Sequence, residues 1–92
     1  MSTVRIPPVL RAAAGNQKQL DFPGATVGEV LTGLTGAHPG LRDQILTAEG
    51  ELNRFVNVYL NDQDIRYLQA LATPVDERDT VVILPAMAGG GR

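Results

Sequence analysis

The sequence has no cysteine and no tryptophan, and it has one histidine, His38, and one lysine, Lys18. Without cysteine the chain cannot form a disulfide, a thiolate zinc site or a catalytic thiol. One histidine cannot supply a histidine-rich metal site, and a Ser-His-Asp triad would depend on Ser2, the only serine. We therefore expect no metal site and no catalytic side chain.

Long apolar runs and a surplus of one charge are also missing. The chain has 8 Lys and Arg against 10 Asp and Glu, a net charge of −2, whereas nucleic-acid binding usually relies on a basic surplus. No run approaches the roughly 20 apolar residues of a membrane span, and the N-terminus does not look like a signal peptide. We expect a cytoplasmic protein with no nucleic-acid partner and no membrane contact.

The sequence does contain glycines and prolines that divide it into short elements of one small domain. The segment 3–10 begins as a strand that Pro7 and Pro8 end, because proline cannot donate to a ladder. The segment 17–22 predicts a second strand, joined to the first in a hairpin across a turn at 15–16. The positions expected to face inward are Val4, Ile6, Leu20 and Phe22.

A helix is predicted after these strands, and its start has the strongest local signal. Thr26 and Glu29 have capping-box spacing, in which Glu29 reaches back to the Thr26 N–H. Apolar residues follow at helical period, and Gly36 and Pro39 end a helix of about 11 residues. The segment 41–46 adds one further turn. The apolar positions are Val27, Val30, Leu31 and Leu34.

The second half of the chain predicts further strands. Phe55–Leu60 alternates, which places Val56, Val58 and Leu60 inward and the aromatic residues opposite. Ile65 is expected to return inward on a short strand. Thr80–Leu84 is nearly all apolar, which predicts a central strand covered on most of both faces. The fold class is therefore α+β, with one main helix on one face of a mixed sheet.

The end of the chain is rich in glycine, with three in a row at 89–91. We expect a folded domain over 1–85 and a flexible tail over 86–92. Such a tail is either a plain disordered end or a functional arm. A glycine arm suits a narrow enzyme channel, because no Cβ widens it, and a glycyl carboxylate is unhindered for activation.

Several segments of the sequence together match one known pattern: 4–11 with Gly15, 26–31, 58–61, 73–75, 79–81 and 83–90. Through them, and over nearly its whole length, the sequence resembles the ubiquitin-like β-grasp sulfur carriers of the MoaD/ThiS family. The resemblance implies a β-grasp fold, and residues 54–62 and 83–86 make it strongest to the carriers that serve cysteine biosynthesis.

The resemblance implies a carrier that is not itself an enzyme and binds no cofactor. In such carriers an E1-like enzyme uses ATP to adenylate the terminal glycine, and a sulfur donor then leaves a thiocarboxylate. A PLP-dependent cysteine synthase would accept the sulfur, and a JAMM-type zinc peptidase would release the product. Open alternatives are molybdopterin (with the synthase large subunit as partner), thiamin or natural-product routes, a protein modifier, and a β-grasp binding module without tail chemistry.

The resemblance also assigns residue roles. Gly90 aligns with the glycine that is activated, and Ala88 and Gly89 belong to the arm before it. Gly91 and Arg92 depart from the family's Gly-Gly end, so we expect both to be removed by the same class of metallopeptidase. The alternative is removal of Arg92 alone, which would leave Gly91 as the end. The docking surface is expected on the exposed side of the sheet near the arm. Its members would be Pro7, Phe55, Tyr59, Leu84 and Met87.

Overall fold

A computed structural model describes residues 1–85 of the chain. Residues 86–92 lie outside this part, so the expected tail, with Met87, Ala88, Gly89, Gly90, Gly91 and Arg92, stays a prediction. Among the described residues, no helix is long and apolar enough to cross a membrane.

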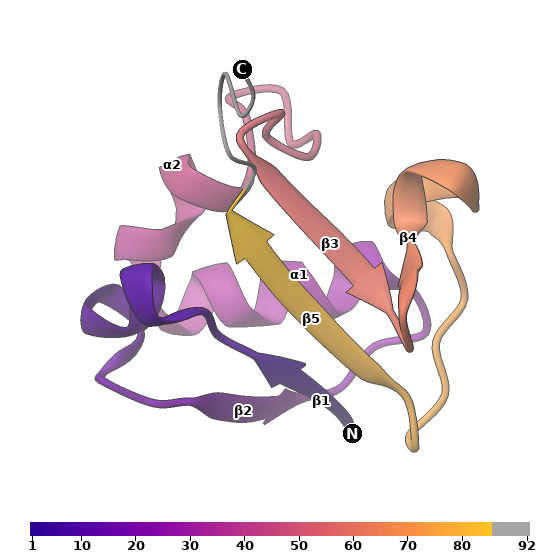
Figure 1. Cartoon of the computed structure of the whole chain (residues 1–92), viewed down its shortest axis with the longest axis horizontal. Helices are drawn as coiled ribbons and strands as arrows, with labels where there is room; N and C mark the ends of the chain where they lie inside the picture. The colour runs from indigo at the N-terminus through magenta and orange to yellow at the C-terminus, as the bar shows by residue number, and fades with distance from the viewer. Residues whose placement is uncertain (86–92) are drawn as a thin grey trace.

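Five strands form one mixed sheet in the order β2-β1-β5-β3-β4 (Figure 1). The central strand β5 runs parallel to β1, while the other neighbours are antiparallel. The central place of this strand and the α+β class are as predicted. The strands are β1 (Ser2–Arg5), β2 (Gln19–Phe22), β3 (Val56–Leu60), β4 (Gln63–Asp64) and β5 (Thr80–Pro85).

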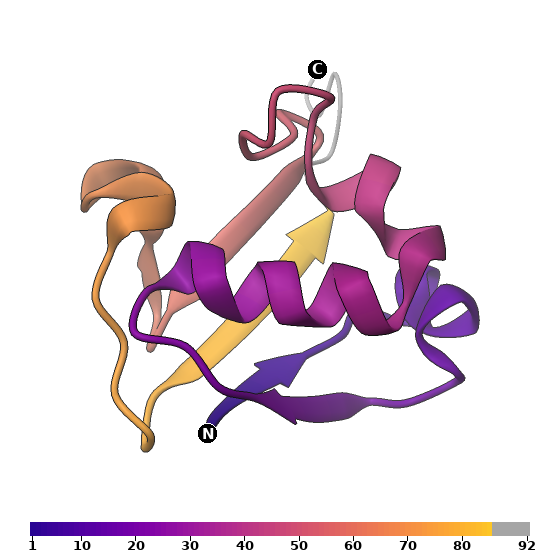
Figure 2. The ribbon, with the colours of Figure 1, turned by 180° about the vertical axis from the view of Figure 1, so that it is seen from behind.

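The main helix α1 (Val27–Ala37) crosses one face of the sheet (Figure 2). Its cap forms as predicted on one side: the Glu29 N–H donates to Thr26 Oγ1 at 3.2 Å. Glu29 Oε1, however, accepts from the Ala25 N–H at 2.9 Å and not from the Thr26 N–H. The short helix α2 (Arg42–Ile45) supplies the further turn that was expected.

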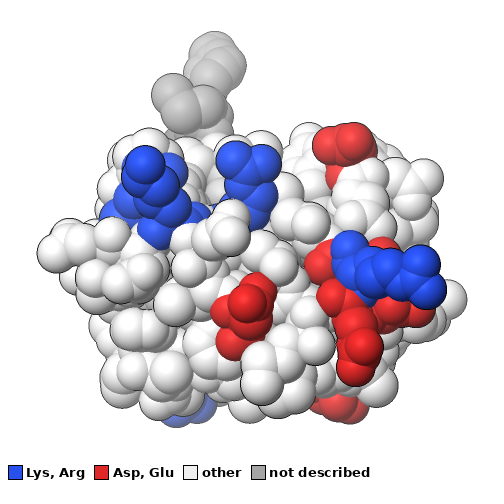
Figure 3. All heavy atoms as spheres, turned by 90° about the horizontal axis from the view of Figure 1, so that it is seen from below, with Lys and Arg blue, Asp and Glu red and all other residues white. Residues whose placement is uncertain are grey.

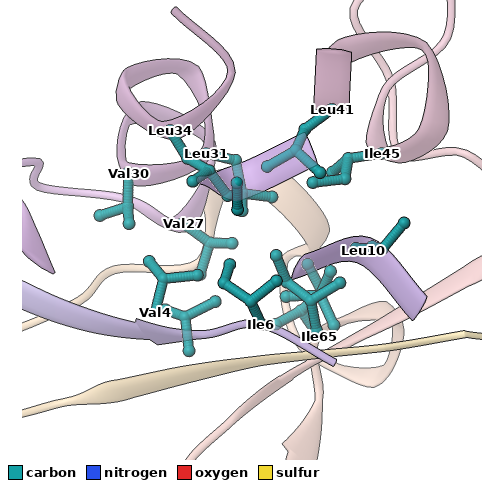
Figure 4. Close-up of a cluster of buried hydrophobic side chains, with 14 of the residues drawn as sticks. Val4, Ile6, Leu10, Val27, Val30, Leu31, Leu34, Leu41, Ile45 and Ile65 are labelled. Carbon is teal, nitrogen blue, oxygen red and sulfur yellow. The ribbon is translucent and has the colours of Figure 1, made fainter. Parts of the chain in front are cut away.

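The core lies between α1 and the sheet (Figure 4). Every predicted inward position of β1, α1 and β3 is buried, and Leu20 and Phe22 of β2 pack against its border. Helix α2 and the segment after β1 close one end of it. Their buried contributions are Leu10, Ala14, Leu41 and Ile45.

A 3-10 helix, η1 (Pro8–Ala14), stands where the sequence predicted only the end of a strand and a turn. The fixed φ of Pro8 suits its first turn, and Gly15 ends it in the left-handed region at φ 67°, where its N–H donates to the Arg11 carbonyl. Strands β1 and β2 therefore pair as predicted, but η1 joins them instead of a tight hairpin turn.

Three further 3-10 helices complete the described chain: η2 (Pro39–Leu41), η3 (Ile65–Tyr67) and η4 (Ala70–Ala72). Ile65 is buried as expected, but it begins η3 instead of lying on a strand. The Asp64 side chain accepts from the Arg66 N–H at 2.9 Å, which ends β4 and starts this helix.

The prediction that β5 is covered on most of both faces is wrong. Val81 and Ile83 point into the core, whereas Val82 is half-buried and Leu84 is 41% exposed. The helices lie behind the sheet in Figure 1, and the face toward the viewer is open. Leu84 is therefore exposed at the end of β5.

Candidate functional site

The site is built around the last two described residues, Leu84 and Pro85, at the end of β5. Successive residues of a strand point to opposite faces, and each of these two lines a separate hollow. The predicted tail continues from Pro85, so both hollows lie at its root.

The hollow on the Leu84 side, which we call the cationic hollow, has a volume of about 380 Å³. Three cations line it: Arg5 from β1, Arg11 from η1 and Lys18 from the turn before β2. No acidic residue is among its described lining. The Arg11 Nε–H donates to the Ile6 carbonyl at 3.1 Å, which fixes this side chain at the rim.

The hollow on the Pro85 side, which we call the apolar hollow, has a volume of about 330 Å³. Its most exposed apolar walls are Val9 of η1, 69% exposed, and Phe55, 53% exposed. The Arg54 guanidinium lies 5.1 Å from the centroid of the Phe55 ring, within cation–π range. The remaining walls come from Leu10, Gln44, Asn53 and Val56.

Phe55 and Tyr59 do not share one face, contrary to the sequence-based prediction. The Phe55 N–H donates to Asn53 Oδ1 at 2.9 Å, so Phe55 lies in a turn and β3 begins only at Val56. Strand alternation does not extend into a turn. Tyr59 lies half-buried in the strand, paired in register with Val82 and Asp64, whereas Phe55 lines the apolar hollow.

Pro7 also differs from its predicted exposure. It contributes to the wall of the cationic hollow, but it is buried, at the point where the chain passes from β1 into η1. Leu84 is the predicted docking residue that the structure leaves exposed on the open face. Met87, the fifth predicted docking residue, lies outside the described part.

Arg5 and Lys18 also lie in this region, and the sequence did not identify either of them as a docking residue. Arg5 alternates with the buried Val4 and Ile6, so the period of the strand already placed it on the open face. Lys18 had no such signal, since its position depends on how η1 leads into β2. Among residues 1–85, no group of metal-ligating side chains is close enough to hold an ion.

The fold and the site define a small β-grasp domain with two hollows at the end of its last described strand. The ThiS family model matches residues 4–90, and the chain belongs to this family. It is a sulfur carrier of ubiquitin-like fold, and its relatives are carrier and modifier proteins, not enzymes.

Three relatives illustrate the match. The sulfur carrier protein CysO of Mycobacterium tuberculosis is 42% identical over 90 residues, covering 96% of this chain and 97% of that protein. Small archaeal modifier protein 3 of Haloferax volcanii is 38% identical over 66 residues, 72% and 71% of the two chains. A chain in the crystal structure of the Amycolatopsis orientalis BexX/CysO complex is 41% identical, with a TM-score of 0.89 over 98% of this chain and 100% of that one.

Proposed function

We propose that the chain carries sulfur as a thiocarboxylate on Gly90 and donates it in cysteine biosynthesis. The observation that carries this proposal is the family match, which ends at Gly90 and leaves Gly91 and Arg92 beyond it. The 42% identity to a relative named CysO supports the choice of cysteine.

The chemistry needs an activating enzyme, because a free carboxylate is a poor electrophile. In an E1-like enzyme a Gly90 carboxylate oxygen attacks the α-phosphorus of ATP, and pyrophosphate leaves. A sulfur donor then attacks the carbonyl carbon of the acyl adenylate, and AMP leaves with the former carboxylate oxygen. The product is a soft nucleophile ready for transfer, and ATP is used by the enzyme and not held by the carrier.

In cysteine synthesis the thiocarboxylate sulfur would form a bond to the β-carbon of a dehydrated amino acid that a PLP-dependent partner synthase supplies. An S-to-N shift then moves the acyl group to the amine, which leaves cysteine amide-linked to Gly90. Hydrolysis by a JAMM-type zinc peptidase releases cysteine and regenerates the carrier. The same class of peptidase would remove Gly91 and Arg92 before the first cycle.

Docking would use the surfaces at the root of the arm. Leu84 and Tyr59 offer apolar area on the open face, and Phe55 offers it in the apolar hollow. Large, partly exposed apolar side chains beside polar groups are typical of protein interfaces. An enzyme that holds Gly90 would therefore contact both sides of the end of β5.

Intact mass tests the proposal. We expect a chain that ends at Gly90, incubated with ATP, sulfide and the E1-like enzyme of the same genome, to become heavier by about 16 Da, because sulfur replaces oxygen. The chain ending at Arg92 is the matched control and should stay unchanged. Thiocarboxylation of the intact chain would contradict the processing step, and an unchanged Gly90 chain would contradict the carrier chemistry.

A protein modifier is the second candidate, because the archaeal relatives named modifiers are similar along most of this chain. In that case the activated Gly90 would form an isopeptide with a target lysine instead of accepting sulfur. Mass spectra of conjugates from cells separate the two functions, since a modifier leaves its glycine remnant on lysines of other proteins. For a carrier in a molybdopterin, thiamin or natural-product route, the acceptor enzyme would differ while the mass change stays.

A further inference from the structure

We infer that the cationic hollow is the docking site for an acidic surface segment of the enzyme that activates the tail. The inference rests on the proposed function for the identity of that enzyme. It names a recognition chemistry that the tail itself does not supply, namely ion pairs beside the apolar contact at Leu84.

The first support is the arrangement of the three cations. Arg5, Arg11 and Lys18 come from three successive segments and line one hollow. No salt bridge joins them to a carboxylate within residues 1–85, and the Arg5 and Lys18 side chains make no hydrogen bond to the described chain. Their charges are therefore available to a partner, and Arg11 is already oriented by its bond to Ile6.

The second support is the contrast with the rest of the surface. The chain as a whole is negative, at −2. In Figure 3 several Lys and Arg side chains lie at the upper left, while most Asp and Glu lie on the right with a further basic group among them. An acidic partner surface would be repelled by the acidic side and attracted to the cationic hollow, whose described lining holds three cations and no carboxylate. Such complementarity orients an encounter and suppresses wrong docking poses.

The third support is reach. Leu84 lines the hollow, and the six residues from Pro85 to Gly90 can extend at most about 20 Å at roughly 3.4 Å per residue. An enzyme that holds the Gly90 carboxylate in its active site must therefore place some of its surface near the hollow. Val82 and Leu84 supply the apolar floor that lets the ion pairs lose part of their water.

A matched pair of double variants tests the inference through binding of the full chain to the E1-like enzyme, measured by calorimetry. Arg5→Gln with Lys18→Gln removes two cations of the hollow. Arg42→Gln with Arg78→Gln removes two exposed cations elsewhere, so both variants carry the same net charge of −4 (−2 − 2). At low salt we expect the first pair to weaken the Kd about tenfold and the second less than twofold.

The same binding measurement at high salt provides a second test. In about 0.5 M NaCl the Kd values of wild type and hollow variant should converge, because the Debye length falls well below 10 Å. Equal weakening by both pairs, or a hollow-variant defect that persists in high salt, overturns the inference. Unfolding curves of both variants establish that the fold is intact.

Two further results would separate a failure of the docking inference from a failure of the proposed function. Saturable NMR shifts of the hollow residues with inorganic phosphate, at a Kd below about 1 mM, would make the hollow a small-anion site and overturn the inference. If wild type binds the enzyme but never gains the sulfur mass, the proposed function fails. The comparison of the two variants still decides whether the hollow docks the enzyme.

Discussion

Arg66 is an exposed residue, but its guanidinium holds the start of β3 through three hydrogen bonds. Its Nη1 donates to Asn57 Oδ1 at 2.8 Å, and its Nη2 donates to the carbonyls of Asn53 and Val56 at 3.1 and 2.9 Å. Asn53 and Val56 also line the apolar hollow. The guanidinium therefore fixes one wall of the site.

We expect Arg66→Lys to lower the free energy of unfolding by about 1 kcal/mol, because one ammonium cannot reach acceptors spread over this fork. Urea unfolding measures the change. Arg78→Ala is the control, since its exposed side chain makes no hydrogen bond to the described chain, and it should stay within about 0.5 kcal/mol of wild type. Equal stability of the lysine variant and wild type would contradict this role for Arg66.

Single residues were predictable from the sequence where their neighbours along the chain decide their environment. Val4 and Ile6 were placed inward by strand period alone. The role of Arg66 was not, because its acceptors lie 9 to 13 residues away across a turn. Phe55 was misplaced for a related reason, since the Asn53 side chain holds it in a turn and β3 begins one residue later than alternation suggests.

Among the elements, α1 was predicted almost residue by residue, because a capping box and an apolar stripe are local signals. Strand β4 and helix η3 were harder. Only two residues pair in β4, and the Asp64 cap that begins η3 competes with strand extension at Ile65. Helix η1 was not predicted, because Pro7 and Pro8 were interpreted only as the end of the first strand. Pro8 is also the first residue of η1.

Substitutions at the two ends of α1 are expected to change the free energy of unfolding in opposite directions. Thr26→Ala should destabilise the protein by about 1 kcal/mol, because the Glu29 N–H loses its acceptor. Gly36→Ala should stabilise it by about 0.5 to 1 kcal/mol, since Gly36 is helical and a Cβ there meets nothing within 4 Å. Thermal and urea unfolding measure both changes.

Thr26→Ser is the control for the cap, because it keeps a hydroxyl acceptor and should remain close to wild type. If Gly36→Ala destabilises the protein, the last turn of α1 is not the regular helix described here. If Thr26→Ala has no effect, the cap hydrogen bond contributes nothing to stability.

At the scale of the whole molecule, the sequence predicted the architecture but not the division of its surface. The α+β class follows from local signals in α1 and in the longer strands, whereas the β-grasp topology was implied by the family resemblance. The two hollows join residues that are far apart along the chain, such as Lys18 with Leu84 and Val9 with Phe55. Such juxtapositions depend on how η1 and the turn before β3 fold back, so one predicted docking patch became two surfaces.

Two exposed aromatic residues make this division testable. Phe55 lies in the apolar hollow beside Pro85, whereas Tyr67, 89% exposed, lies on η3 beyond the β4 edge of the sheet. We expect Phe55→Ala to weaken binding of the full chain to the activating enzyme about tenfold, as truncation of an interface aromatic does. Tyr67→Ala should leave the Kd within about twofold.

Both substitutions remove an exposed ring, so similar unfolding free energies are expected and any difference in binding reports location. The salt response should also separate the two sides of β5. The Phe55→Ala defect should persist in high salt, because it removes apolar contact, while the defect of the Arg5 and Lys18 variant should vanish. An equal loss for Phe55→Ala and Tyr67→Ala would mean that the enzyme does not discriminate the root of the arm from the far edge of the sheet.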